Sequence, residues 1–415
     1  MKILIVGSGG REHAIAWKFK QSQATHQLFC ANGNAGIAEI ANCVDIKPHE
    51  TNKLADFAET EKIDLTFVGG EVSLALGIVD EFEKRGLRIV GASKKAAQLE
   101  ASKAFSKDFM FRHNIPTAKY KVAKSTVEAK QFLIEFDESV VVKADGLAAG
   151  KGVVVCENKL QAINAIDELE SLAGTEAMSQ IVLEERLIGR EVSLLLFCDG
   201  RNFALMPPVR DHKRIGEGDM GANTGGMGTV CDDSLLSAEL TAKIINEIVK
   251  PTLKGCETEG FPFRGILFIG LMLTENGAKV LEYNVRFGDP ETQSIMLGLE
   301  TDLVEICNAI LTQTLDKLEI VWKKGSSACV ILAAENYPNK PKLGDKISGL
   351  ENVKNAEIFH GGTAKDENGN FITNGGRVLG VTATAENLTE ALNLAYKSVD
   401  EISWNGMQFR RDIGK

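Results

Sequence analysis

The feature that most constrains the fold of this chain is a short apolar run that leads directly into glycines. Residues 3–6 (ILIV) predict a strand, and residues 7–10 (GSGG) predict a tight turn that opens a helix. Two further apolar runs, residues 65–68 and 87–90, are separated by a helical pattern. Short apolar strands that alternate with helices are typical of a parallel sheet buried on both faces. Residues 1–101 are therefore predicted to form an α/β domain.

The helical patterns of this first part are long. One is expected near residues 71–85, and another over residues 93–113, where Pro116 follows shortly after its end. Proline removes a backbone donor and clashes with the preceding turn, so a helix is expected to stop before it.

The rest of the chain changes character twice. Residues 102–324 predict an α+β unit, with short strands and helices first, then longer strands and a helix near residues 234–259. A glycine-rich loop is expected over residues 210–229, and a loop of that length inside a compact domain is usually functional. Residues 325–327 (GSS) predict a linker, and residues 325–415 predict a small β-rich domain with tight turns.

Composition and charge exclude several classes of protein. The net charge of −10 disfavours binding to nucleic acid or to an anionic membrane. The apolar run before Gly7 is too short for a signal-peptide core, and no apolar run reaches the length of a membrane span. The eight cysteines are dispersed without a C-x-x-C pair, which is typical of reduced thiols. We therefore expect a cytoplasmic protein.

A first candidate site is the turn at residues 7–13 (GSGGREH), where backbone N–H groups and the helix dipole favour a phosphate. A dinucleotide is not expected, because Glu12 stands where the fingerprint needs a small residue. The next strand, residues 28–32, also ends without a carboxylate for a ribose. A phosphate-bearing small substrate fits better, and a purely structural turn is the alternative. Residues 32–36 (NGNAG) are expected to line the same crevice.

A second candidate is the strand–loop–strand pattern of residues 141–153, in which two lysines flank a run of glycines and alanines. Small residues allow such a loop to close over a nucleotide triphosphate, while the amines neutralise its oxygens. A Walker A loop would open a helix, whereas a strand follows here. A solvated hairpin with two surface lysines is the alternative.

A third candidate follows an apolar strand at residues 280–292. Residues two apart in a strand point the same way, so Glu282, Asn284 and Arg286 are expected to share a face. A carboxylate and an amide oxygen suit Mg²⁺, whose other ligands would be phosphate oxygens and water. A buried salt-bridge network is the alternative. His212, in the glycine-rich loop, is weak evidence by itself because structural histidines are common.

Taken together, these segments resemble the phosphoribosylamine–glycine ligases (glycinamide ribonucleotide synthetases), a family of the ATP-grasp superfamily. The matching blocks lie in family order along the whole chain, at residues 7–14, 33–36, 102–105, 143–152, 211–214, 223–228, 282–293 and 374–379. The resemblance implies an α/β fold class with a Rossmann-like N-terminal domain, a two-lobed ATP-grasp core with a mobile lid at about residues 119–190, and a small β-rich C-terminal domain.

The resemblance also implies a reaction. ATP would activate glycine as glycyl phosphate, and 5-phosphoribosylamine would then attack it, giving glycinamide ribonucleotide, ADP and phosphate in the second step of purine synthesis. Carboxylate attack on a phosphate brings anions together, so cations and a metal must offset the repulsion. Mg²⁺ or Mn²⁺ is the implied cofactor, and a monomer or weak dimer is expected.

The roles that the resemblance implies fall into four sets. The ATP-binding residues would be Lys103, Lys143, Asp145, Gly146, Gly150, Lys151, Gly152, Glu184, Glu185, Leu187 and Glu191. The substrate-binding residues would be Gly9, Gly10, Arg11, Glu12, Asn34, Asp211, Lys213, Arg286, Gly288, Asp289 and Glu291. The metal ligands would be Glu282 and Asn284. The catalytic residues would be Lys143, Arg286 and Asp211, with Arg286 on the glycine carboxylate and Asp211 on its ammonium.

The chain departs from the family pattern at a few places. Gly70 and Ser73 stand where many relatives have prolines, and residues 209–210 and 229–231 also differ. The strand before Glu282 carries no further acid, so a second metal ion would lack a full set of protein ligands. Two alternatives stay open: another ATP-grasp ligase of the purine pathway, and a nucleotide-binding module without catalysis.

Overall fold

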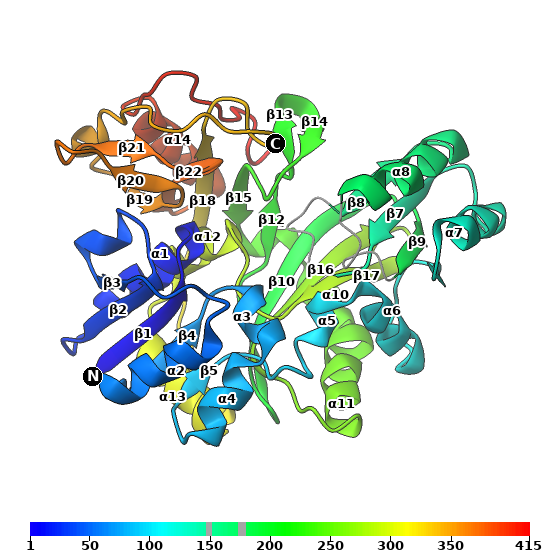
Figure 1. The fold of residues 1–415 in the computed structure, drawn as a ribbon, viewed down its shortest axis with the longest axis horizontal. Helices are drawn as coiled ribbons and strands as arrows, with labels where there is room; N and C mark the ends of the chain where they lie inside the picture. Colours follow the sequence, from blue (N-terminus) through cyan, green and yellow to red (C-terminus); the bar gives the residue numbers. More distant parts are fainter. Residues whose placement is uncertain (147–151, 173–179) are drawn as a thin grey trace.

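The computed structural model describes residues 1–146, 152–172 and 180–415. Its N-terminal part is a five-stranded parallel sheet of order β3-β2-β1-β4-β5, which confirms the predicted parallel sheet (Figure 1). The strands are β1 (Lys2–Gly7), β2 (Gln27–Asn32), β3 (Asn42–Val44), β4 (Leu65–Val68) and β5 (Ile89–Val90). The main helices around it are α1 (Gly10–Lys20), α2 (Thr51–Thr60), α3 (Glu71–Leu76) and α4 (Ile78–Lys84).

Both long helices predicted in this part are interrupted. Gly77, with φ of +91°, ends α3 in a left-handed conformation and separates it from α4. The second pattern divides into α5 (Gln98–Ala101) and α6 (Lys103–Arg112), because Ser102 is extended and its Oγ caps α6 by accepting from the Phe105 N–H. The apolar periodicity continues across both breaks, so periodicity alone could not place them.

A separate lobe follows at the right of Figure 1, with a four-stranded antiparallel sheet of order β6-β9-β7-β8. Its elements are β6 (Tyr120–Ala123), α7 (Thr126–Phe132), β7 (Val140–Ala144), β8 (Val153–Cys156), α8 (Lys159–Leu172) and β9 (Ile181–Glu185). The lobe has its own hydrophobic core between the sheet and the two helices. The predicted strand–loop–strand pattern is confirmed, since β7 and β8 pair directly on either side of the loop.

The largest sheet has nine strands and is antiparallel. Its strands are β10 (Arg190–Asp199), β11 (Phe203–Leu205), β12 (Val209–Asp211), β15 (Gly228–Cys231), β16 (Arg264–Thr274), β17 (Gly277–Asn284), β18 (Ser326–Ala333), β19 (Glu357–His360) and β22 (Arg377–Ala385). The linker predicted at residues 325–327 is wrong. Ser326 and Ser327 are buried at the start of β18, where Ser327 pairs with Cys231 of β15. The C-terminal part therefore extends the central sheet.

The loop expected over residues 210–229 is also wrong in part. It contains the hairpin of β13 (Arg214–Gly216) and β14 (Met220–Asn223) between β12 and β15. Arg410, near the C-terminus, is fully buried beneath this hairpin, where it pairs with Asp219 at 2.8 Å and donates to the Arg214 carbonyl at 3.2 Å. The hairpin depends on a residue almost 200 positions away, which no local pattern reveals.

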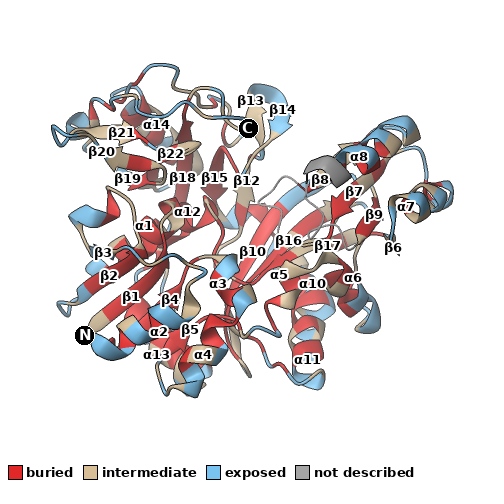
Figure 2. Ribbon diagram, viewed as in Figure 1, coloured by how far each residue is buried: buried red, intermediate tan, exposed pale blue. Residues whose placement is uncertain are grey.

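The remaining helices cover the central sheet. The helix expected near residues 234–259 consists of α10 (Ala238–Ile244), a π-helical segment (Ile245–Val249) and α11 (Lys250–Thr258). The others are α12 (Glu291–Gly298), α13 (Leu303–Thr312) and α14 (Leu388–Val399), and a small hairpin is formed by β20 (Thr363–Lys365) and β21 (Phe371–Thr373). Helix α12 contacts α1, β15, β18 and β22, and Figure 2 shows it buried where the N-terminal and C-terminal parts meet. Among the described helices, none combines the length and the apolar character that crossing a membrane requires.

The contact between α1 and β19 predicts a dependence of stability on pH. His13 Nδ1 accepts the His360 N–H at 2.8 Å, and burial lowers the pKa of His13 to about 3. The unfolded chain takes up a proton below about pH 6.5 while the folded chain cannot, so stability falls as the pH drops below that value. We expect this group to reduce the free energy of unfolding by about 2 kcal/mol between pH 7 and pH 5.

The measurement is urea unfolding at both pH values. His13→Asn keeps a hydrogen-bond acceptor but does not titrate, so its loss between pH 7 and pH 5 should be smaller than that of the wild type by this amount. His49→Asn, at an exposed histidine, serves as the control and should behave like the wild type. Equal losses in all three proteins would contradict the account.

Candidate functional site

Two cavities meet near the middle of the molecule. The first, here called the central cavity, has a volume of about 460 Å³ and lies between the N-terminal sheet, the lobe and the central sheet. The second, here called the interdomain cavity, has about 870 Å³ and lies between the start of α1 and the C-terminal part. The predicted site residues that line the central cavity are Arg11, Lys103, Lys143, Gly146, Gly152, Glu184, Asp211, Lys213, Glu282, Asn284, Arg286, Asp289 and Glu291.

A buried carboxylate lies between two lysines in the central cavity. Glu184 Oε1 is 2.7 Å from Lys143 Nζ, and its Oε2 is 2.8 Å from Lys107 Nζ. Burial acts to raise the pKa of Glu184, but the charges of the two lysines outweigh it and leave the pKa below its ordinary value. Burial lowers the pKa of Lys107 to about 8. Lys107 is a residue that the sequence did not single out, although it lies one helical turn after Lys103.

Other residues of the predicted ATP-binding set lie near this group. Lys103 Nζ donates to the Gly146 carbonyl at 2.8 Å, and both oxygens of Asp145 accept bonds from the start of α6. Glu185 pairs with Lys279 at 3.0 Å, and Leu187 is half-buried after β9. Gly150 and Lys151 lie outside the described residues.

Glu282 differs from the other acids of the cavity. Within the part of the chain that the structure describes, its carboxylate makes no hydrogen bond or ion pair. Burial acts to raise the pKa of Glu282, but the nearby charges outweigh it and leave the pKa below its ordinary value, so the group is ionised. These charges belong to Lys213, Lys143, Lys103 and Arg286. An ionised carboxylate that faces several cations and lacks a direct partner suits a metal ion bridged to phosphates. Gly270 lies opposite Glu282 on β16, so that strand adds no second acid.

Arg286 is held by several acceptors. Its Nη2 lies 2.6 Å from Glu100 Oε1 and 3.0 Å from Asn284 Oδ1, and its Nε lies 3.2 Å from Glu71 Oε2. The sequence missed Glu71 and Glu100 as site residues. Glu71 follows two glycines at the end of β4, the same strand–glycine pattern as at Gly7, and this signal could have found it. Glu100 lies inside a helical pattern and carries no such signal.

Two further acids face the cavity together. Burial and the nearby Glu291 raise the pKa of Asp211 well above its ordinary range, and burial also raises the pKa of Glu291. Asp211 Oδ1 is buried, and among the described residues it has no hydrogen-bond partner. Such a pair of carboxylates suits a ligand that carries an ammonium group. Glu191 is half exposed and pairs with Lys213 at 3.0 Å.

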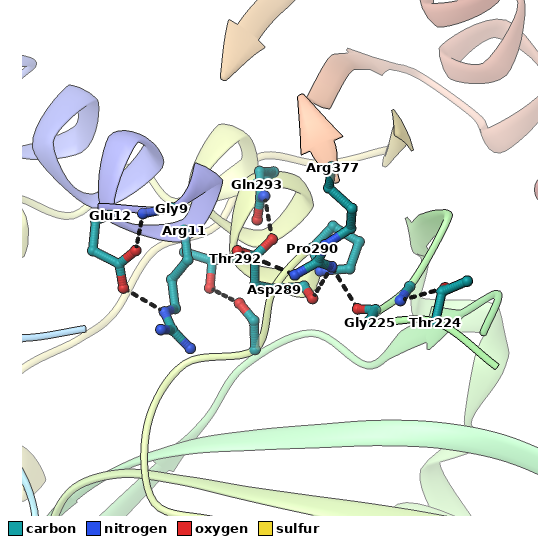
Figure 3. Close-up of polar contacts among 12 residues, drawn as sticks. Gly9, Arg11, Glu12, Thr224, Gly225, Asp289, Pro290, Thr292, Gln293 and Arg377 are labelled. Carbon is teal, nitrogen blue, oxygen red and sulfur yellow. Dashed lines mark hydrogen bonds and ion pairs between the residues drawn. The ribbon is translucent and has the colours of Figure 1, made fainter. Parts of the chain in front are cut away.

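The start of α1 is occupied by carboxylates of the chain itself. Glu12 is buried; its Oε2 accepts the Gly9 N–H at 2.6 Å and its Oε1 pairs with Arg11 Nε at 2.7 Å (Figure 3). Gly7 is needed beside it, because a Cβ there would lie 2.5 Å from Glu12 Cγ. The Arg11 backbone N–H donates to Asp289. Glu12 therefore caps the helix, and its expected role in substrate binding stays a prediction.

Three other predicted residues are part of the scaffold. All four hydrogen-bonding positions of the Asn34 amide are used, by Ser8 O, His360 O, Gly36 N and Ile37 N. Gly288 has Glu291 Oε2 close beside it, at 2.2 Å from where a Cβ would stand. His212 Nδ1 donates to Gly228 O, and its Nε2 accepts the Gly414 N–H. Gly9, Gly10 and Asn34 line the interdomain cavity.

The departures from the family pattern are accommodated by packing. Ser73 is buried, and its Oγ donates to the Pro48 carbonyl at 2.6 Å. Residues 229–231 form most of β15, where Thr229 Oγ1 donates to Pro290 O at 3.1 Å. These substitutions therefore support the scaffold around the site.

Family models of phosphoribosylglycinamide synthetase match the chain almost throughout. The N domain matches residues 1–100, the ATP-grasp (A) domain residues 101–292 and the C domain residues 327–415. A phosphoribosylamine–glycine ligase of Haemophilus influenzae is 47% identical over 421 residues, covering 100% of this chain and 98% of the relative. The crystal structure of the Thermotoga maritima phosphoribosylamine–glycine ligase superposes with a TM-score of 0.86 at 34% identity, covering 100% of both chains. Biotin carboxylase of Campylobacter jejuni, at 16% identity and a TM-score of 0.75, shares the fold over 98% of this chain and 92% of its own.

The fold and the cation-lined cavity define an ATP-grasp enzyme. The chain belongs to the phosphoribosylglycinamide synthetase family. The family and the fold class expected from the sequence are confirmed, and the expected function is the one that the names of the family and of its relatives state.

Glu184 is buried between Lys143 and Lys107, so removing its charge is expected to destabilise the fold strongly. Glu184→Gln leaves two buried ammonium groups uncompensated, so we expect a loss of about 3–5 kcal/mol in the free energy of unfolding. Adding Lys107→Met should recover part of this loss, because it removes one of the unpaired charges. Urea unfolding of the single and double variants measures both effects.

Glu135→Gln is the matched control. Glu135 pairs with Lys121 at 2.9 Å on the surface, and such pairs contribute less than about 1 kcal/mol. A loss for Glu184→Gln no larger than that of the control would contradict the assigned role of the buried carboxylate.

Proposed function

We propose that this chain joins glycine to 5-phosphoribosylamine at the expense of ATP, forming glycinamide ribonucleotide, ADP and phosphate. The observation that carries the proposal is the ionised Glu282, which faces Lys103, Lys143 and Lys213 in the central cavity and has no direct partner among the described residues. That charge arrangement suits a nucleotide triphosphate with its metal, and the relatives named as phosphoribosylamine–glycine ligases cover the full chain.

The ATP side of the cavity is assigned to two of its lysines and to the residues around them. Lys103 and Lys143 hold the phosphates, and Glu184, by holding Lys143, positions its ammonium. Glu282 and Asn284 are the proposed ligands of Mg²⁺ or Mn²⁺, which neutralises phosphate charge when bound. The amide oxygen of Asn284 accepts from Arg286 at 3.0 Å and retains a second lone pair for this role.

The glycine side lies at Asp211, Glu291 and Arg286. The two carboxylates, with raised pKa values, are placed to accept hydrogen bonds from an ammonium, and Arg286 offers its guanidinium to a carboxylate. A glycine carboxylate oxygen attacks the γ-phosphorus, the bond from that phosphorus to ADP breaks, and glycyl phosphate forms. Exclusion of water protects this reactive species.

The second step forms the amide. The amine nitrogen of phosphoribosylamine bonds to the glycyl carbonyl carbon, and the bond from that carbon to the phosphate oxygen breaks. Inorganic phosphate leaves and takes the proton that the nitrogen loses. Gly9, Gly10, Arg11 and Asp289 are the proposed contacts on this side.

Three further properties are part of the proposal. The chain is divided at about residues 101 and 324, with residues 119–190 as a lid over the ATP. It is a monomer or a weak dimer. Its eight free cysteines, seven of them buried, support a reducing compartment such as the cytoplasm.

The proposal predicts a strict dependence on both co-substrates. With ATP and Mg²⁺, release of ADP should require glycine and freshly generated phosphoribosylamine, and glycinamide ribonucleotide should be found by mass spectrometry. ADP release that is indifferent to either co-substrate would assign the scaffold to a different ligase.

The metal assignment predicts the effect of one substitution. Glu282→Gln keeps the size of the side chain and removes its charge, so we expect amide formation to fall at least about 100-fold, with the fold retained by circular dichroism. Glu275→Gln, at an exposed turn between β16 and β17, is the control. A wild-type rate for Glu282→Gln at saturating Mg²⁺ would remove Glu282 from the mechanism.

A further inference from the structure

Two cysteines lie side by side at one edge of the N-terminal sheet. Cys30 of β2 pairs in register with Cys43 of β3, and β3 is the edge strand of this parallel sheet (Figure 1). Residues paired in register on neighbouring parallel strands point to the same face, and such strands lie about 4.8 Å apart. A disulfide requires α-carbons that are about 4.4–6.8 Å apart. The backbone therefore places these two cysteines within reach of a disulfide.

The side chains of both cysteines approach the same turn. The Cys30 Sγ–H donates to the Gly7 carbonyl at 3.2 Å, and its sulfur accepts the Gly33 N–H. Cys43 Sγ lies so close to Gly33 that it would collide with a Cβ at that position. Gly33 also has a φ of +75°, which favours glycine. The two thiols therefore converge on Gly33 from neighbouring strands.

The two thiols differ in their access to solvent. Cys43 is exposed and lines the interdomain cavity, whereas Cys30 and the other six cysteines are buried. A small oxidant that enters this cavity meets Cys43 first, and Cys30 lies behind it as a second thiol. Burial raises the pKa of both thiols, so the pair is protonated and reduced in its resting state.

We propose that Cys43 and Cys30 form an oxidation-sensitive dithiol, which hydrogen peroxide converts into a disulfide. The Cys43 sulfur bonds to one peroxide oxygen, the O–O bond breaks, and the other oxygen leaves as water with the Cys43 proton. Cys43 is then a sulfenic acid. The Cys30 sulfur bonds to the Cys43 sulfur, the S–O bond breaks, and the hydroxide leaves as water with the Cys30 proton. The two thiols lose two electrons and the peroxide gains them, and a dithiol reductant reverses the change.

The disulfide alters the turn beside the proposed phosphate contacts. Cys30 loses its proton, so its Sγ no longer donates to the Gly7 carbonyl. The sulfur of Cys43 must also move from its place beside Gly33. The next residue, Asn34, ties this turn to the C-terminal part through its side chain. We therefore expect the disulfide to weaken the binding of a sugar phosphate at the start of α1. This consequence rests on the proposed function, whereas the chemistry of the pair does not.

The disulfide is tested directly by mass spectrometry. The full-length protein is treated with hydrogen peroxide, and the remaining thiols are then blocked with iodoacetamide in denaturant. The wild type should give a linked peptide pair that contains Cys30 and Cys43 and is two hydrogens lighter than the separate peptides. Cys231→Ala, which removes a buried thiol of β15, is the matched control and should form the same link.

Two variants separate the steps. In Cys30→Ala, whose fold is checked by circular dichroism, Cys43 should stop at the sulfenic acid, which dimedone traps. Cys43→Ser should give neither the link nor the dimedone adduct. A dimedone adduct on Cys43 of the wild type without the link, or oxidation of a buried cysteine before Cys43, would overturn the proposal.

The effect on binding is measured with ribose 5-phosphate as the probe. Its dissociation constant should rise by about fivefold in the oxidised wild type, which is the usual worth of one lost hydrogen bond. Dithiothreitol should reverse the rise, and peroxide should leave the affinity of Cys43→Ser unchanged. The dissociation constant of a non-hydrolysable ATP analogue should change by less than about twofold. An unchanged affinity for ribose 5-phosphate in a protein that carries the disulfide would overturn the effect on binding.

The outcomes separate this inference from the proposed function. A protein that forms the disulfide but no glycinamide ribonucleotide would keep the dithiol and reject the proposed function. A protein that forms glycinamide ribonucleotide but no disulfide under peroxide would reject the dithiol alone.

Discussion

One half-buried carboxylate, that of Asp289, joins the three parts of this molecule. Asp289 follows the central sheet, accepts a backbone N–H at the start of α1, and pairs with Arg377 at the start of β22. An ionised carboxylate is costly to bury unless several partners compensate it, so these elements must meet at one point for the charge to be tolerated. The two cavities lie on either side of that point. The requirement to compensate the charge of Asp289 therefore helps to fix where the two cavities form.

Much of the fold could be predicted because it depends on local patterns. The apolar runs around residues 3–6 and 65–68 lie in the parallel sheet, and β7 pairs with β8 as the strand–loop–strand pattern predicted. Many of the lysines and acids that line the central cavity were named through the resemblance to the family, whereas Lys107, Glu71 and Glu100 were missed. Whether each of these residues binds the ligand assigned to it stays a prediction.

The features that escaped prediction depend on contacts between distant residues. Glu12 caps its own helix because Gly7 and Gly69 leave room for its side chain, a property of three-dimensional packing. Ser326 and Ser327 have the composition of a linker, yet they continue a sheet whose neighbouring strand lies about a hundred residues earlier. Glu100 binds Arg286 across 186 positions in the sequence. No periodicity or motif carries such information.

The central claim is that ATP binds beside Glu282 in the central cavity, whereas the sugar phosphate binds at the start of α1 and Asp289. The most direct test is a crystal structure of the protein with Mg²⁺, glycine, a non-hydrolysable ATP analogue and ribose 5-phosphate. The account predicts the triphosphate beside Lys103, Lys143 and Glu282, and the sugar phosphate in the interdomain cavity with its C1 directed at Asp289. A sugar phosphate bound in the central cavity, or outside both cavities, would contradict it.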